Sequence, residues 1–131
     1  MRREILGYDP VDKQYKVLSM TWGSTCGRQE EASHQVLTLG TENPLWRRIN
    51  CCIPHFPLHY EICINGVLYY QAGNVSCSGS IIICFDVRSE TFRFIKFLGS
   101  YPRLVNYNGK LGLLLSEETE FVHGRSKSIE L

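Results

Sequence analysis

The sequence predicts an all-β fold of antiparallel four-stranded sheets, arranged as the blades of a partial β-propeller. No long window shows clean helical periodicity, because glycine, proline or another turn former interrupts most apolar runs. The run IIICF at 81–85 is short, β-branched and continuous, as expected for a strand covered on both faces. A pattern also recurs about every 45 residues, which is typical of propeller blades.

Three pairs of segments show the repeat. WRRI at 46–49 lies 46 residues before FRFI at 92–95, and both read aromatic-Arg-x-Ile. VLTL at 36–39 aligns with IICF at 82–85 at the same offset. Asn65-Gly66 recurs as Asn108-Gly109, each between apolar runs. Asn-Gly at such a place predicts a tight hairpin, because a type I′ turn needs positive φ at both central residues.

The repeat divides the chain into about two and a half blades. Blade one covers 4–50, with strands near 4–8, 14–21, 34–40 and 45–50 and a long loop at 23–33. Blade two covers 60–97, and an incomplete blade three covers 103–131, where 129–131 reads as the opening of a strand. We expect one partial domain over 1–131 with open sheet edges, which are sites of association. The alternative fold is a sandwich or open barrel of about eight to ten strands.

Composition excludes several classes of function. Of the 131 residues, 44% are hydrophobic and 21% charged, as in a globular domain, and the net charge of +1 argues against binding nucleic acid or a membrane. No apolar run is long enough to cross a bilayer, and MRREILGYDP has no apolar leader core. We therefore expect an intracellular protein, in cytoplasm or nucleus, whose six cysteines are reduced and mostly buried.

Four blocks carry a resemblance to a known family. GYDPVDKQYKVL at 7–18, VLTLGTENPLWRRI at 36–49, ICINGVLYY at 62–70 and IIICFDVRSETFRFI at 81–95 resemble the F-box-associated domain of plant F-box proteins, in its type-three, kelch-like variety. In that family an N-terminal F-box docks on the Skp adaptor of a cullin-based ubiquitin ligase, and the associated domain recruits the protein to be ubiquitinated. The blocks include no F-box, so the resemblance implies a protein target as partner and leaves Skp binding in doubt. A truncated relic without ligase function is the alternative.

One cysteine–histidine pattern is similar to a zinc site. Thiolates and imidazoles are zinc ligands, and the pattern contains Cys51, Cys52, His55 and His59, with Cys63 close by. However, adjacent side chains of an extended chain point to opposite faces, and Pro54 and Pro57 interrupt the helix that a zinc finger needs. We therefore expect no metal and no cofactor. His34 and His123 lie in polar stretches, where we expect them to be exposed.

No catalytic signature is recognisable, so the sequence predicts a protein-interaction module and not an enzyme. A small-ligand binder or enzyme using a propeller channel is the alternative, and polar residues converging on the innermost strands would favour it. We expect Trp46, Phe92 and Phe94 in the core. Aromatic and arginine side chains anchor protein interfaces, and three of them lie near strand ends, where loops are presented. These candidate partner-binding residues are Trp22, Arg28 and Tyr101.

Overall fold

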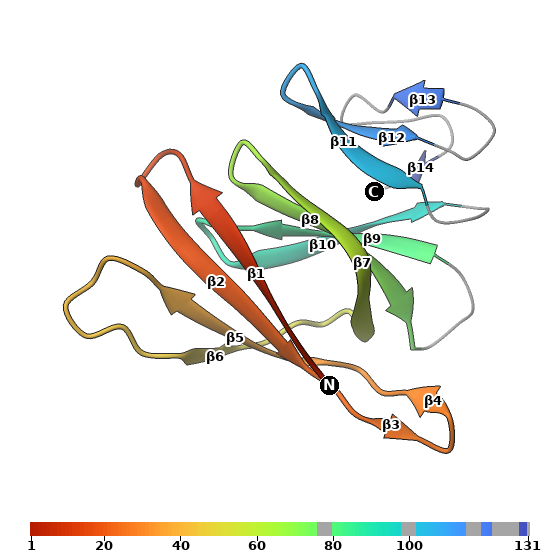
Figure 1. Cartoon of the computed structure of the whole chain (residues 1–131), viewed down its shortest axis with the longest axis horizontal. Helices are drawn as coiled ribbons and strands as arrows, with labels where there is room; N and C mark the ends of the chain where they lie inside the picture. Colours follow the sequence, from red (N-terminus) through yellow and green to blue (C-terminus); the bar gives the residue numbers. More distant parts are fainter. Residues whose placement is uncertain (76–79, 98–101, 115–118, 122–128, 131) are drawn as a thin grey trace.

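The computed structural model describes residues 1–75, 80–97, 102–114, 119–121 and 129–130, and these residues contain strands and turns but no helix. Blade one is an antiparallel sheet in the order β1-β2-β5-β6 (Figure 1). A short hairpin of β3 and β4 projects from the connection between β2 and β5. The bounds are β1 Arg2–Asp9, β2 Gln14–Thr21, β3 Ser24–Thr25, β4 Arg28–Gln29, β5 Ser33–Thr38 and β6 Arg47–Ile49.

Two further sheets follow blade one along the chain. Blade two has the order β14-β10-β9-β8-β7, and blade three has the order β11-β12-β13. The bounds are β7 His55–Ile64, β8 Val67–Asn74, β9 Ser80–Asp86, β10 Thr91–Phe97, β11 Arg103–Tyr107, β12 Lys110–Leu114, β13 Thr119–Phe121 and β14 Ile129–Glu130. The all-β prediction of successive antiparallel blades is thus confirmed.

Both Asn-Gly pairs form the expected turns. Asn65 and Gly66 have φ of 49° and 82°, and Asn108 and Gly109 have φ of 50° and 79°. Positive φ at both central residues is the geometry of a type I′ turn, which matches the twist of the flanking strands. The first hairpin of blade two and the first hairpin of blade three are therefore built in the same way, and the Asn65 side chain donates to the Gly109 carbonyl at 3.0 Å.

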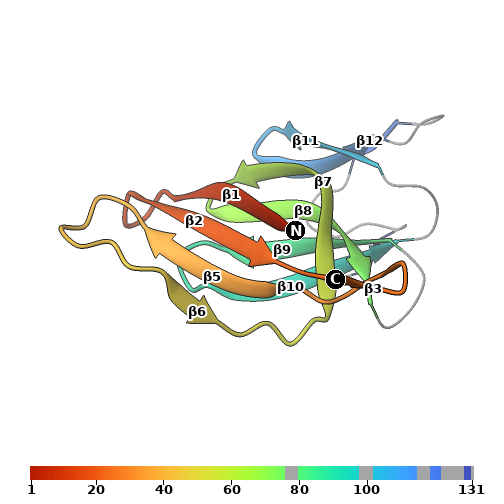
Figure 2. The same ribbon diagram turned by 60° about the horizontal axis from the view of Figure 1, so that its bottom comes forward.

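Strand β9 is buried on both faces, as its apolar run predicts. Ile81, Ile83 and Phe85 pack in one cluster with residues of blade one, among them Leu18 and Val36. The alternate residues of β9 belong to a second cluster, which contains Ile82, Cys84, Ile95, Leu104, Leu111 and Leu113. Figure 1 shows the blade-two sheet lying between blade one and blade three, and in Figure 2 the strands of blade one lie in front of those of blade two. This sheet is therefore shielded from water by its two neighbours, as in a stack of blades.

The first strands of the three blades lie together. Strand β7 contacts both β1 and β11 (Figure 1). In a propeller, four-stranded sheets radiate from a central channel. The contacts of β7 therefore identify the first strand of each blade as the innermost one. β6 and β10 lie toward the outside.

Two aromatic residues expected in the core are exposed. Trp46 is 38% exposed and Phe94 39% exposed, whereas Phe92 is half-buried and packs against the blade-one cluster. Trp46 lies with Arg2, whose guanidinium is 5.8 Å from the indole centroid. Trp46 and Arg2 both occupy the face of blade one that points away from blade two, and no described sheet covers this face. Trp46 and Phe92 thus share a repeat position but not an environment.

Two strand boundaries differ from the sequence expectation. β7 begins at His55 and passes through Pro57, with a break in register between Pro57 and Glu61. Proline is tolerated there because β7 is an edge strand, where one row of N–H groups needs no partner. The segment at 129–130, which we expected in blade three, pairs instead with β10 of blade two. The outer edge of β10 offers unpaired backbone groups for this addition.

The cysteines are less buried than expected. Cys84 is buried and Cys51 and Cys63 are half-buried, but Cys26 and Cys52 are exposed, and all five are free thiols. Cys77 lies outside the described residues. Exposure of Cys26 follows from its place in the turn of the β3–β4 hairpin, which stands clear of the sheets. Among the described residues, no helix is long and apolar enough to span a membrane.

Candidate functional site

The β3–β4 hairpin carries two of the three predicted partner-binding residues. Arg28 is exposed on β4. Trp22 is half-buried and packs against the core cluster of blade one and blade two. Its indole N–H donates to the Gln29 side-chain oxygen at 2.6 Å. Trp22 therefore holds the base of the hairpin, while Arg28 is free to meet solvent or a partner. Tyr101 lies outside the described residues.

A cavity of about 570 Å³ opens beside the hairpin. Its lining mixes one cation, two carboxylates, and small polar and apolar side chains: Thr25, Cys26, Arg28, Gln29, Glu30, Glu31 and Val75. The Thr25 hydroxyl donates to the Glu30 carboxylate at 3.0 Å, which orders one wall. Such a lining suits hydrogen bonds and ion pairs with a polypeptide better than enclosure of an apolar small molecule.

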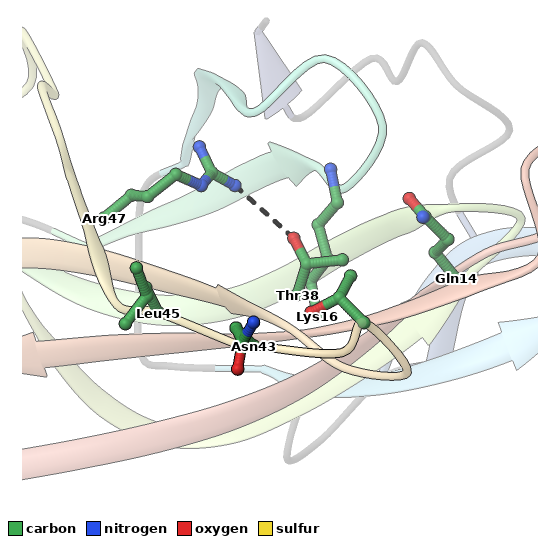
Figure 3. Close-up of a pocket in the computed structure, with 7 residues that line it drawn as sticks. Gln14, Lys16, Thr38, Asn43, Leu45 and Arg47 are labelled. Atoms are coloured by element: carbon green, nitrogen blue, oxygen red, sulfur yellow. Dashed lines mark hydrogen bonds between the residues drawn. The ribbon is translucent and has the colours of Figure 1, made fainter.

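A second cavity, of about 460 Å³, lies on blade one at the opposite end of the strands (Figure 3). Figure 3 shows Arg47, Thr38 and Lys16 along one side, with Leu45, Asn43 and Gln14 nearby. The Arg47 guanidinium lies 3.5 Å from the Thr38 hydroxyl oxygen. The loop between β5 and β6 forms the outer rim of this cavity.

An ionic network joins this second cavity to blade two. Glu90, in the turn between β9 and β10, accepts from Arg47 at 2.9 and 2.7 Å, one bond to each carboxylate oxygen. It also accepts from the nearly buried Lys16 ammonium at 2.8 Å. The Lys16 ammonium donates to the Val87 carbonyl at 2.9 Å as well. Hydrogen bonds from Arg47, and then from Lys16, lower the pKa of Glu90. The network therefore fixes blade two against blade one.

Two histidines meet at the other end of the same junction. His34 of β5 and His55 of β7 are buried, with their Nε2 atoms 3.3 Å apart. The Tyr70 hydroxyl lies 2.8 Å from His55 Nε2, and His55 Nδ1 lies 2.8 Å from the Ile53 carbonyl oxygen. Burial, and then the neighbouring His55, lower the pKa of His34 to about 3, and burial also lowers the pKa of His55. Both rings are therefore neutral at physiological pH.

The cysteine–histidine pattern of the sequence is only partly assembled. Cys51 Sγ lies 3.9 Å from His55 Nδ1, but Cys52 and His59 are exposed. His34 completes a group of three, whose ligand atoms all lie within 4.8 Å of one another. We expected His34 to be exposed, which is wrong, because β5 turns it toward blade two. No local sequence signal links His34 to His55, since the contact depends on how two blades pack.

The same geometry argues against cysteine–histidine catalysis. A carbonyl oxygen can only accept, so His55 Nδ1 carries the proton that it donates to Ile53 and cannot take one from Cys51. Burial raises the pKa of the Cys51 thiol to about 11, whereas a catalytic thiol needs a lowered pKa. On the innermost strands, an ion pair joins Arg3 of β1 to Glu61 of β7. This ion pair joins the first strands of blade one and blade two.

Comparison with known proteins settles the family. Residues 2–131 match the model of a family described as the F-box associated beta propeller domain. The chain belongs to this family. The resemblance found in the four sequence blocks is therefore confirmed over nearly the whole chain. The F-box associated domain is an interaction domain of F-box proteins and is not a known class of enzyme.

Relatives of this F-box associated domain occur in Arabidopsis thaliana. F-box protein At5g65850 is 52% identical over 130 residues, which are 95% of this chain and 31% of the relative. F-box protein DOR is 51% identical over 120 residues, or 91% of this chain and 30% of the relative. F-box only protein 12 is 48% identical over 110 residues, or 81% of this chain and 26% of the relative. The chain therefore spans about a third or less of these relatives. No solved structure is detectably similar to it.

Proposed function

We propose that the chain is a protein-recognition module that acts as the substrate-recognition part of an F-box subunit of a cullin-type ubiquitin ligase. The observation that supports this most is the family match over residues 2–131, combined with relatives named as F-box proteins. In this role the module holds a target protein, and other subunits of the ligase transfer ubiquitin. The module therefore needs a binding surface and no catalytic residues. It acts in the cytoplasm or the nucleus.

The β3–β4 hairpin is the surface that fits this role best. It is exposed over its whole length, it carries Arg28, and Trp22 and Gln29 fix its base. A rigid base with exposed polar and charged tips can bind a partner without a large entropy cost. The positive charge of Arg28 and the negative charges of Glu30 and Glu31 favour a target segment that itself carries both signs of charge.

A charge-reversal experiment tests the role of the hairpin. Tagged wild-type chain, Arg28→Glu and Arg103→Glu are used for quantitative affinity purification from plant extract. Arg103 is exposed on β11 of blade three, so its reversal is a matched control at a site remote from the hairpin. We expect a protein that is enriched by wild type and by Arg103→Glu and is lost with Arg28→Glu.

The purification also tests the ligase assignment. Stoichiometric recovery of the Skp adaptor with this chain would show that adaptor docking does not need the rest of an F-box protein. Equal recovery of every protein by all three chains would contradict recognition through the hairpin. To test the recruiting role itself, the recovered partner is followed in plant cells in which cullin ligases are inhibited, where a ubiquitination target is expected to accumulate.

A further inference from the structure

We propose that His34, Cys51 and His55 form a binding site for a divalent zinc-like metal ion, which joins blade one to blade two. The three residues come from β5, from the connection between β6 and β7, and from the first residue of β7. Imidazole nitrogens and a thiolate sulfur are the ligands that zinc prefers. Their ligand atoms all lie within 4.8 Å of one another.

The distance between the Nε2 atoms of His34 and His55 fits a tetrahedral zinc site. Zinc binds imidazole nitrogen at about 2.0–2.1 Å. Two nitrogens 3.3 Å apart, each at that distance from one ion, subtend an angle of about 104–111° at the metal. This range includes the tetrahedral angle. The separation of His34 Nε2 and His55 Nε2 therefore fits two ligands of one zinc ion.

The hydrogen bonds of His55 orient it as a ligand. His55 Nδ1 donates to the Ile53 carbonyl, which fixes the ring and leaves a lone pair on Nε2. Both the Tyr70 hydroxyl, at 2.8 Å, and His34 Nε2, at 3.3 Å, face this nitrogen. When His34 carries its proton on Nδ1, its Nε2 also has a lone pair. A cation between the rings then accepts one lone pair from each imidazole.

Cys51 supplies the third ligand. The Cys51 sulfur lies 3.9 Å from the opposite nitrogen of His55 and 3.5 Å from the Ile53 carbonyl oxygen. It must therefore leave this carbonyl and turn toward Nε2 to reach a Zn–S distance of about 2.3 Å. The Tyr70 hydroxyl lies beside the site, 2.8 Å from His55 Nε2, and the fourth position is left to water, as in zinc sites with three protein ligands. Binding forms a zinc–thiolate bond and releases the thiol proton to water.

A cavity borders the site at His34. Its volume is about 350 Å³, and it is lined by Glu31, Ala32, Ser33, His34, Arg48, Ile49 and Asn50. The lining carries one carboxylate, Glu31, and one guanidinium, Arg48, so it has no net positive charge to repel a cation. His34 thus borders a cavity on one side, while blade two covers the other.

The test uses full-length chain, purified in reductant and freed of metal with a chelator. Wild type is titrated with zinc and with cobalt(II), which reports geometry through its visible bands and thiolate ligation through a near-ultraviolet charge-transfer band. We expect about one equivalent of zinc, tetrahedral cobalt bands, the thiolate band, and a rise in melting temperature with zinc. Cys51→Ser should abolish the thiolate band. Both Cys51→Ser and His34→Gln should weaken zinc binding at least about 10-fold.

Two matched controls lie in the same sequence pattern. Cys52 and His59 are exposed, so Cys52→Ser and His59→Asn should bind zinc and cobalt as wild type does. Circular dichroism checks that each variant is folded. If His34→Gln does not fold, Cys51→Ser alone tests the proposal. Less than about a tenth of an equivalent of zinc on the wild type would overturn the proposal. Loss of the thiolate band with Cys52→Ser instead of Cys51→Ser would also overturn it.

Discussion

Glu90 of blade two binds Arg47 of blade one through both carboxylate oxygens, at 2.9 and 2.7 Å. Arg47 is half-exposed, but Glu90 and Lys16 are largely enclosed, with side chains 15% and 9% exposed. Lys16 and Arg47 come from β2 and β6, and Glu90 comes from the turn between β9 and β10. A single carboxylate thus ties two strands of one blade to a turn of the next.

Removing the charge of Glu90 should destabilise the fold. We expect Glu90→Gln to lower the free energy of unfolding by about 1–3 kcal/mol, because the enclosed Lys16 ammonium loses its anion. Chemical denaturation measures this change. Glu42→Gln, at an exposed position in the loop before β6, is the matched control and should change the free energy of unfolding by less than about 0.5 kcal/mol. Equal effects of the two substitutions would contradict a role for the network.

The stability of the chain should fall in acid partly through Glu90. The folded pKa of Glu90 is lowered from 4.5, chiefly by the Arg47 hydrogen bonds. Its contribution is therefore complete above the unfolded value, and it is lost as the pH falls through the lower folded value. Denaturation of wild type and Glu90→Gln between pH 7 and about 3 should show the two curves converging below pH 4.5. Parallel curves over this range would exclude the linkage.

Close contact between blade one and blade two should make Gly7 intolerant of a side chain. A Cβ at Gly7 would lie 2.8 Å from Val87 Cγ2 and 2.9 Å from Leu68 Cδ1, across the junction. Gly7→Ala should therefore cost about 1–3 kcal/mol, and the cost should be smaller in the presence of Val87→Ala. Gly23→Ala is the control, because its Cβ meets only the carboxylate end of the exposed Glu30 side chain, which can turn aside into solvent. A neutral Gly7→Ala would show that the two blades are not packed as described.

Burial of β9 on both faces should make its two sets of side chains equally sensitive. Ile83→Ala removes contacts with blade one, and Ile82→Ala removes contacts with the blade-three side. Each should cost about 2–5 kcal/mol. Leu6→Ala, on the exposed face of β1, should cost less than about 0.5 kcal/mol. If Ile82→Ala were as mild as Leu6→Ala, blade three would not cover blade two in solution.

The uncovered face of blade one should promote self-association. Leu6 is 54% exposed and Tyr15 50% exposed, and the Tyr8 and Tyr15 rings pack at 4.6 Å on the same face. Exposed apolar patches of this kind mark interaction surfaces. Sedimentation velocity should show concentration-dependent association that Leu6→Lys with Tyr15→Lys suppresses and that Val11→Lys, in an exposed turn, does not. A wild-type chain that remains monomeric at every concentration would contradict this expectation.

The sequence predicted those elements whose signals are local. Asn65-Gly66 and Asn108-Gly109 need positive φ, and both form the expected turns. The run at 81–85 has no polar face, so it required cover on both sides, and it has such cover. These predictions succeeded because turn chemistry and strand periodicity act within a few residues.

Predictions that depended on neighbouring blades were less successful. Trp46 occupies the repeat position of Phe92 but is exposed, because no described sheet lies over its face. His34 was expected at the surface and is buried against His55, 21 residues away in sequence. Each miss concerns packing between sheets, which a pattern within one strand cannot report.

Hydrogen exchange of backbone amides tests the central claim most directly, since that claim is the enclosure of the β7–β10 sheet between blade one and blade three. Amides of β9 should exchange most slowly, because their release requires both neighbouring sheets to open. Amides of β1 and β6, in a sheet with one uncovered face, should exchange faster. Exchange in β9 as fast as in β6 would contradict the account.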